Sequence, residues 1–484
     1  MTETEIILRR LREFESRNIT YLERRAGWPI VWQRARGTRV WDADGRPYLD
    51  LTAAFAVAAA GHANPRVVKA GQRQMATLLH AMGDVHPHAL KAELARQLSR
   101  LTFERWSRTP GGGDGPLPGA PRARSGGKLP LSSGRAATRS SSGRPGRLRG
   151  KTIYGNSGFE AVEAALKTAL LASGRPGVIA FHGAYHGLGY GALNATHRDF
   201  FRAPFLPQLV EFGHFLPFPK LPGDLGVLEG AIDRLFRRQP IGAVLVEPVQ
   251  GRGGINVPPP GFLPLLRRGC DAHGAVLIVD EIFTGFGRTG RWFACEHAGT
   301  IPDLICLGKA LTGGFPLSAC VGRADVMDAA WPASTGEAIH TSTFLGHPVG
   351  CAMALAQIAE IQDRGLVERS AALGERLLTW LERIAAGPAG PGESRAKRGL
   401  RFEVRGLGLM AGLELTERNG SPATRLAIRV VQEMLRRGYI LLPEGEQANV
   451  ISLTPPLTIR RADLERAVQV LEQTLTGAAR GCLA

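Results

Sequence analysis

Five short runs of uninterrupted apolar residues restrict the fold of this chain more than any other feature of its sequence. The runs are 178–181 (VIAF), 241–246 (IGAVLV), 275–279 (AVLIV), 304–307 (LICL) and 319–321 (ACV). Strands that are apolar throughout are typical of parallel sheets, because helices cover both faces of such a sheet. Since the runs alternate with helical segments, they predict an α/β fold with a mostly parallel sheet.

Helical and turn patterns complete this outline. Apolar residues at helical spacing follow Gly158 (positions 162, 165, 166, 169 and 170) and Asp463 (positions 464, 467, 468, 471 and 475), so both segments predict amphipathic helices. Segment 41–50 (WDADGRPYLD) has an Asp-Gly turn between apolar flanks and predicts a hairpin. Segment 449–459 (NVISLTPPLTI) predicts a strand that its two prolines end.

Residues 105–150 form a basic window that does not fit this pattern. The window holds ten lysines and arginines against one acid, Asp114, and carries nine of the seventeen net positive charges. Its many glycines, prolines and serines bury too little apolar surface to offset their ordering entropy, so it predicts a disordered insert. A frameshifted stretch of coding sequence would have the same composition. Nucleic-acid binding is the alternative, but Trp106 is the window's only aromatic residue for base stacking, so we do not expect a nucleic-acid partner.

Cysteine spacing and the N-terminus bear on the cellular compartment. The six cysteines are scattered without a CxxC pair or finger-like spacing, so we expect reduced core cysteines and no metal site. They are Cys270, Cys295, Cys306, Cys320, Cys351 and Cys482. The N-terminus (MTETEIILRR) has acids before a short apolar stretch, and no run approaches the roughly 20 apolar residues that span a bilayer. We therefore expect a cytoplasmic protein that does not enter the membrane.

Two predicted strand ends carry side chains suited to chemistry. Asp280 follows run 275–279, and Lys309 follows run 304–307 after one glycine. α/β sheets bind ligands at the carboxyl ends of their strands. There an aspartate can hold a proton on a heterocyclic nitrogen, and a desolvated lysine becomes nucleophilic because its pKa falls. Taken singly, a strand-end aspartate such as Asp280 is more often a helix cap or part of a buried salt bridge, and a strand-end lysine such as Lys309 is more often a solvated surface group.

Two further segments could bind a planar, phosphorylated cofactor. In the NSGFE segment that opens the first helix, Ser157 can cap the helix and Gly158 allows close approach, so the free N–H groups there can bind a phosphate. Tyr185 and His186 follow run 178–181, where a flat ring could stack on a cofactor. The alternatives are a capped helix and a core aromatic residue.

The order of these segments resembles the class III (omega-type) aminotransferases, which are pyridoxal-phosphate enzymes of fold type I, and within them the 4-aminobutyrate and ornithine aminotransferases. The resemblance covers nearly the whole chain apart from the basic window. The matching stretches are GHANP at Gly61, SGFEAVEAALK at Ser157, FHGAYHG at Phe181, VEPVQG at Val246, VDEIFTGFGRTG at Val279, LGKALTGG at Leu307, STFLGHP at Ser342, VRGLGLMAGLEL at Val404 and NVISLTPPLTI at Asn449.

The resemblance implies an enzyme that moves an amino group, in particular a terminal one, from an amine or amino acid to a 2-oxo acid such as 2-oxoglutarate or pyruvate. It also implies a large domain over residues 61–339, with a mostly parallel sheet between helices. A smaller α+β domain over residues 340–484 should be joined by the N-terminal segment 1–60.

The resemblance further assigns roles around pyridoxal phosphate. Lys309 should form the Schiff base and shuttle the proton during the reaction. Asp280 should keep the pyridine nitrogen protonated, and Ile282 and Tyr185 should pack on the two ring faces. Glu247 should lie among the catalytic residues. The remaining cofactor contacts that we expect are Ser157, Gly158, Phe159, His186 and Thr343. Thr343 reaches in from the partner subunit in such enzymes, which implies a homodimer.

Two departures from the family bear on the substrate. Relatives that act on glutamate and 4-aminobutyrate carry an arginine where this chain has Ser452, and often a glutamate where it has Arg252. Arg252 could bind a substrate carboxylate instead, or pair with Glu247 when no carboxylate is bound. Phe283 and Phe55 favour an amine with an apolar body. The substrate contacts that we expect are Phe55, Gln250, Arg252 and Ser452.

Two other functions stay open at this point. An aminomutase, racemase or decarboxylase of the same fold could use the same cofactor, because pocket geometry decides which bond breaks. A non-catalytic protein that binds nucleic acid through residues 105–150 belongs to a different functional class.

Overall fold

A seven-stranded sheet organises the larger part of the molecule. The computed structural model describes residues 1–20, 28–107, 148–387 and 399–479. The strand order in this sheet is β4-β10-β9-β8-β7-β5-β6. The strands are β4 (Gly150–Gly155), β5 (Gly177–Phe181), β6 (Gly213–Leu216), β7 (Ile241–Val246), β8 (Val276–Asp280), β9 (Leu304–Leu307) and β10 (Ser318–Arg323).

All five predicted apolar runs are strands of this sheet. From β6 to β9 the neighbouring strands are parallel, whereas β10 is antiparallel to both β9 and β4. The connection between β9 and β10, residues 308–317, contains only a short 3-10 turn. Because an antiparallel pair needs no helical crossover, this short connection fits the reversed direction. The prediction of a mostly parallel sheet is confirmed, with an antiparallel edge.

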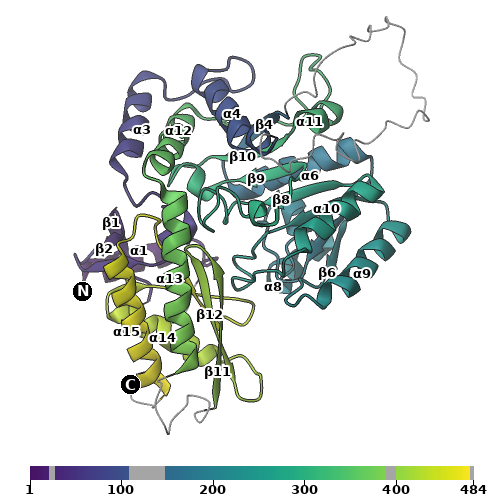
Figure 1. Cartoon of the computed structure of the whole chain (residues 1–484). Helices are drawn as coiled ribbons and strands as arrows, with labels where there is room; N and C mark the ends of the chain where they lie inside the picture. Colours follow the sequence, from purple (N-terminus) through teal and green to yellow (C-terminus); the bar gives the residue numbers. More distant parts are fainter. Residues whose placement is uncertain (21–27, 108–147, 388–398, 480–484) are drawn as a thin grey trace, which may run out of the picture.

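Helices cover both faces of this sheet (Figure 1). Residues of α6 pack with Ile278 in one core cluster, and residues of α10 pack with Val279 in another. Since neighbouring residues of a strand point to opposite faces, α6 and α10 lie on opposite sides. The helices of this part are α3 (Pro65–Thr77), α4 (Ala89–Leu101), α5 (Phe103–Trp106), α6 (Gly158–Ser173), α7 (Tyr190–Leu193), α8 (Asp199–Arg202), η1 (Ala203–Gln208), α9 (Asp224–Arg238), α10 (Phe262–His273), η2 (Ala294–Ala298), η3 (Lys309–Leu311), α11 (Ala324–Ala330) and α12 (Pro348–Asp363).

The buried face of α6 differs from the predicted one at a single position. Four of the five predicted apolar residues are buried, but Leu170 is 46% exposed. Ala161 and Thr168 are fully buried in its place. The prediction was wrong at Leu170 because the covered side of the helix lies closer to Ala161, next to Cys306 of β9, and to Thr168, whose Oγ1 accepts a hydrogen bond from Trp331 Nε1 at 3.0 Å.

Segments from both ends of the chain build the second part of the molecule (Figure 1). One sheet has the order β1-β2-β3-β13, and its β3–β13 pair is parallel, so an N-terminal strand joins a C-terminal one. The other sheet has the order β11-β12-β15-β14 and is antiparallel. The strands are β1 (Trp32–Arg36), β2 (Arg39–Asp42), β3 (Pro47–Asp50), β11 (Leu400–Leu407), β12 (Met410–Glu417), β13 (Tyr439–Ile440), β14 (Leu442–Glu444) and β15 (Val450–Leu453). The helices are α1 (Glu3–Phe14), α2 (Ala53–Ala56), α13 (Leu366–Ala386), α14 (Thr424–Arg436) and α15 (Arg461–Ala479).

Three local predictions for these segments hold. The Asp-Gly turn joins β2 and β3 in an antiparallel hairpin. All five apolar positions predicted for the C-terminal helix are buried in α15. β15 ends at Leu453, just before the two prolines. The predicted fold class is therefore confirmed, while the exact domain boundaries stay a prediction.

The ends of the basic window belong to the folded core. Trp106 is 7% exposed and packs edge-on against Phe103 and Phe293. Arg105 forms an ion pair with Glu296, and Gly150 begins β4. The prediction of a disordered insert was therefore wrong at both ends of the window, at residues 105–107 and 148–150, because contacts with the core fix them. Its central part, 108–147, lies outside the described residues.

The described part of the chain also holds five of the six cysteines. All five are buried and free, and Cys482 lies outside the described residues. Within the described residues, no helix combines the length and the apolar character that a bilayer span requires.

Candidate active site

A cavity of about 390 Å³ lies at the carboxyl edge of the large sheet. Asp280 ends β8, Glu247 follows β7, and Lys309 follows β9 after one glycine, so three strands bring these side chains to one place. The residues that line the cavity are Gly158, Phe159, Tyr185, His186, Gly187, Leu188, Glu247, Arg252, Asp280, Ile282, Phe283 and Lys309. Most of the predicted site residues are therefore brought together.

Asp280 and His186 form a buried pair in this cavity. Asp280 Oδ2 lies 2.8 Å from His186 Nδ1, and Asp280 Oδ1 accepts the N–H of Ile282 at 3.0 Å. Asp280 is 4% exposed and His186 2%. No described residue offers a hydrogen bond to His186 Nε2. The pair holds the aspartate in one orientation, so the carboxylate can face a ligand without rotating.

Lys309 begins the 3-10 turn η3 with a strained backbone. Its φ of +38° lies in the left-handed region, which non-glycine residues rarely adopt outside functional sites. Its Nζ lies 4.9 Å from the centre of the Phe283 ring. Burial lowers the pKa of Lys309, although the carboxylates of Asp280 and Glu247 oppose this shift. A larger share of this amine is therefore neutral, and nucleophilic, than of an exposed lysine at the same pH.

Glu247 fixes two backbone segments at the cavity. Its Oε1 accepts the N–H of Tyr185 at 3.0 Å, and its Oε2 accepts the N–H of Gly251 at 2.9 Å. Burial, and then the nearby Asp280, raise the pKa of Glu247, while His186 acts in the opposite direction. Glu247 thus ties the aromatic segment to the loop that follows β7.

The N-terminus of α6 opens into the same cavity. Gly158 and Phe159 line it, while Ser157 precedes the helix. Ser157 forms a capping box with Glu160, and no described residue accepts a hydrogen bond from the buried Ser157 hydroxyl. A Cβ added at Gly158 would lie 3.0 Å from Ile282, so glycine permits the close packing there. A free hydroxyl and the N–H groups of a first helical turn are the donors that a phosphate needs.

Arg252 forms an ion pair that the sequence did not predict. Its Nε lies 3.6 Å from Glu444 Oε2, and its guanidinium lies 5.3 Å from the centre of the Tyr185 ring. The expected pairing with Glu247 is absent among the described contacts, because Glu247 already accepts two backbone N–H groups. Burial raises the pKa of Glu444, and Arg252 partly offsets this. Glu444 is 6% exposed.

Five predicted contacts do not line the cavity in this chain. Ser157 lies beside it, as described above. Gln250 is structural: its Nε2 donates to the carbonyl of His182 at 2.7 Å. Ser452 Oγ donates to the carbonyl of Leu442 at 3.2 Å, because its place in β15 turns it toward β14. The other two, Phe55 and Thr343, are exposed at the surface.

These features fit pyridoxal phosphate. The cavity has room for a small aromatic ring, phosphate donors at one helix end, a carboxylate for a ring nitrogen and an amine for an aldehyde. His186 Nε2 is buried without a hydrogen-bond partner among the described residues, and none of them accepts a hydrogen bond from the buried Ser157 hydroxyl. Buried polar atoms without protein partners are typical of a site built for a polar ligand.

Comparisons with known proteins agree with this geometry. The family model described as Aminotransferase class-III matches residues 21–109 and 140–475. The 5-aminovalerate aminotransferase DavT of Pseudomonas aeruginosa is 36% identical over 92% of this chain and 93% of its own length. The acetylornithine aminotransferase of Methanosarcina mazei is 33% identical over 92% and 91%. A solved ornithine aminotransferase from Toxoplasma gondii, with pyridoxal phosphate partly occupying its active site, has a TM-score of 0.77 and 26% identity, and the match covers 100% of this chain and 96% of that one.

Proposed function

The chain belongs to the class-III aminotransferases, which use pyridoxal phosphate, and from this premise we propose that it transfers a terminal amino group from an amine or amino acid to a 2-oxo acid. The observation that carries the proposal is the buried Lys309 amine in one cavity with the Asp280–His186 pair. Relatives named for 5-aminovalerate, acetylornithine and putrescine support a terminal amine.

We assign the cofactor contacts from the chemistry of the lining. Pyridoxal phosphate, when bound, draws electrons from the substrate carbon whose proton is removed. The N–H groups of Gly158 and Phe159 and the hydroxyl of Ser157 would bind its phosphate. Tyr185 and Ile282 would pack on its ring.

Asp280 and Lys309 would control the two protons that the reaction requires, one on the ring nitrogen and one on the substrate. The Asp280 carboxyl group is held by His186, and as a carboxylate it would keep a proton on the ring nitrogen. Lys309 would bind the cofactor covalently through Nζ, and once the substrate amine replaces it, would remove and return the substrate proton. Its lowered pKa suits both tasks, because the amine must be neutral to attack and to accept a proton.

The donor class can be tested with a panel of amines. 5-Aminovalerate, N-acetylornithine and putrescine, each with 2-oxoglutarate or pyruvate, should yield glutamate or alanine if the proposal is right. Racemisation, decarboxylation or an amino shift within one substrate, without glutamate or alanine, would instead support the runner-up activities of the fold.

Arg252 is proposed to bind the carboxylate of an amino-acid donor after Glu444 releases it. Arg252→Ala should raise the KM for 5-aminovalerate about 10- to 100-fold, because a charge-assisted hydrogen-bonded pair is lost. The KM for pentylamine, which has the same chain without the carboxylate, should stay within a small factor. Steady-state kinetics with the two donors measure this difference, and equal changes for both would contradict the assignment.

A homodimer is supported by an apolar surface next to Thr343. Leu79, Met82 and Val85 are 58–63% exposed, and Phe344, beside Thr343, is 52% exposed. The rings of His80 and Phe344 are 5.3 Å apart, so the two segments form one patch. Exposed apolar patches of this kind mark interfaces. A second copy of the chain would cover the patch and bring Thr343 to the partner's phosphate site.

Light scattering on a charged variant tests the dimer. Leu79→Asp should shift the protein from two chains to one, because it buries a charge in the proposed interface. Val227→Asp is the control, since Val227 is also exposed but lies on α9. A wild type that is already monomeric would contradict the dimer. The cytoplasmic location stays a prediction of the sequence.

A further inference from the structure

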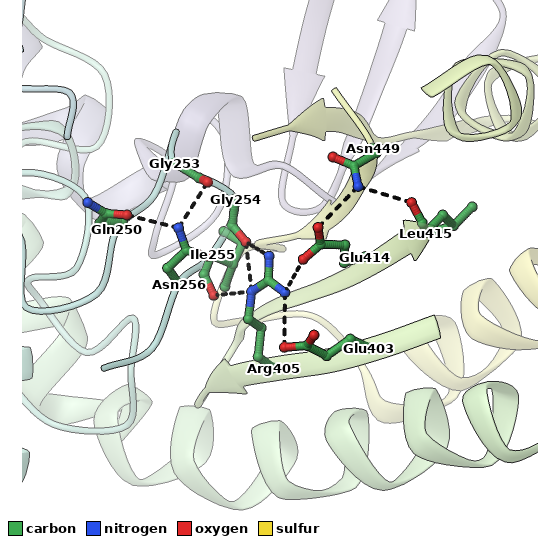
Figure 2. Close-up of polar contacts among 10 residues, drawn as sticks. All are labelled: Gln250, Gly253, Gly254, Ile255, Asn256, Glu403, Arg405, Glu414, Leu415 and Asn449. Atoms are coloured by element: carbon green, nitrogen blue, oxygen red, sulfur yellow. Dashed lines mark hydrogen bonds and ion pairs between the residues drawn. The ribbon is translucent and has the colours of Figure 1, made fainter. Parts of the chain in front are cut away.

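The side chain of Arg405 crosses from the smaller part of the molecule to the loop after β7. Arg405 lies on the edge strand β11, and its side chain is 13% exposed. Its Nε donates to the carbonyls of Gly254 and Ile255 at 3.0 and 3.1 Å, and its Nη2 donates to Gly254 at 2.7 Å. Figure 2 shows these hydrogen bonds between two segments that lie far apart in the sequence.

The other side of the guanidinium is held by a carboxylate. Arg405 Nη1 donates to Glu414 Oε2 at 2.6 Å, and Asn449 Nδ2 donates to Glu414 Oε1 at 3.1 Å (Figure 2). Burial alone would raise the pKa of Glu414, but Arg405 and Asn449 bring it below its ordinary value, so the carboxylate stays charged. The guanidinium of Arg405 is therefore held in place by residues of its own sheet as well as by the loop.

The loop that Arg405 holds is strained and tightly packed. Ile255 has a φ of +54°, a region that β-branched residues rarely occupy, and it is completely buried. A Cβ at Gly412, the partner of Arg405 across the strand pair, would lie 3.0 Å from Ile255. The loop can keep this conformation only if its surroundings over-determine it. The two carbonyls bound by Arg405 supply such a constraint.

The same loop carries Arg252 into the cavity. Gly254 lies two residues after Arg252, and the carbonyl of Arg252 accepts the N–H of Gly445 at 3.2 Å. Across the loop, Asn256 Nδ2 donates to Gln250 Oε1 at 2.8 Å, which closes it into a ring (Figure 2). The carbonyl of Arg252 also accepts a hydrogen bond from the side chain of Arg198. The loop is thus fixed at Arg252 by Arg198 and Gly445, and two residues later by Arg405.

We propose that Arg405 is a positioning residue for substrate recognition: it holds loop 250–256 in its strained form and thereby aims Arg252 at the substrate carboxylate. The inference rests on the proposed role of Arg252. Lysine can replace Arg405 only in part, because one ammonium cannot reach two carbonyls and a carboxylate with the geometry of a planar guanidinium. The loop therefore depends on arginine at this position.

Kinetics with matched donors test the proposal. Arg405→Met should raise the KM for 5-aminovalerate about 10- to 100-fold, since small displacements of a binding group have effects of this size, while the KM for pentylamine and the turnover rates change little. Arg405→Lys should recover only part of the loss. Arg401→Met removes the same charge from an exposed position of the same strand and should leave both KM values unchanged.

A double-mutant comparison separates positioning from general damage. In the Arg252→Ala background, Arg405→Met should have no further effect on the KM for 5-aminovalerate, because the residue it positions is gone. Calorimetry with glutarate, an unreactive dicarboxylate, gives a readout without turnover, and its Kd should rise about tenfold in Arg405→Met. If Arg405→Met does not fold, Glu414→Gln loosens the same guanidinium and should shift both quantities in the same direction, by less.

Several results would overturn the proposal. They are equal KM changes for the two donors, additive effects in the double mutant, and a glutarate Kd that is the same in Arg405→Met and wild type. A selective effect of Arg252→Ala without one of Arg405→Met overturns this inference alone. If Arg252→Ala itself has no selective effect, the assigned carboxylate site is wrong and this inference falls with it.

Discussion

Replacing Lys309 with alanine should abolish amino transfer, with turnover at least about 10³-fold lower than wild type. Lys309 is the only amine among the residues that line the cavity, so no other lining group can bind an aldehyde covalently and then carry the substrate proton. The visible absorption of the purified protein with added pyridoxal phosphate measures the first role. Glutamate formation from 5-aminovalerate measures the second.

Two controls make this result specific. Lys69→Ala removes an exposed lysine from α3 and should change neither colour nor turnover. Lys309→Ala should still bind pyridoxal phosphate non-covalently, because Ser157, Gly158 and Asp280 remain, but dialysis should remove the cofactor faster than from wild type. A Lys309→Ala protein with the absorption and turnover of wild type would show that the reacting amine is elsewhere.

The chemistry of the site could be predicted from the sequence because it depends on strand ends. Asp280 and Lys309 each follow an apolar run, and parallel strands bring their carboxyl ends to one edge of a sheet. Ser157 caps, and Gly158 begins, a helix whose periodicity is clear. The positions of residues that local structure fixes in this way can be predicted without information on contacts between distant segments.

The substrate side of the site could not be predicted in the same way. Glu444 reaches Arg252 only because the short strand β14 lies against the loop after β7, and no local pattern marks that approach. Ser452 aligns with a substrate contact, yet its hydroxyl is bound by the neighbouring strand. Arg405 contacts carbonyls some 150 positions earlier in the chain. Such contacts follow from tertiary packing, which a single sequence does not reveal.

Local sequence patterns also failed to predict which residues are exposed at the surface of the chain. Leu170 fits the apolar stripe of α6 by spacing but lies at its edge, where the sheet does not cover it. Thr343 and Phe55 are exposed and do not line the cavity of their own chain, so their role as ligand contacts stays a prediction that depends on the proposed dimer. Spacing alone does not distinguish a core face from a face that another subunit covers.

Asp280→Asn should lower kcat about 10²- to 10³-fold, and by the same factor for every donor. Asparagine keeps the size of the side chain and can still be hydrogen-bonded to His186, but it has no negative charge to hold a proton on the ring nitrogen of the cofactor. Because that proton is needed whenever a substrate proton is removed, the loss cannot depend on the far end of the donor.

This uniform loss distinguishes Asp280 from the substrate-binding residues. Arg252→Ala and Arg405→Met should raise the KM for carboxylate donors, whereas Asp280→Asn should slow turnover of pentylamine and of 5-aminovalerate alike. Asp328→Asn is the control, since Asp328 is an exposed carboxylate on α11 that pairs with Lys151. An Asp280→Asn enzyme whose turnover stays within a small factor of wild type would mean that the ring nitrogen is held by another group, and His186 would be the first to test.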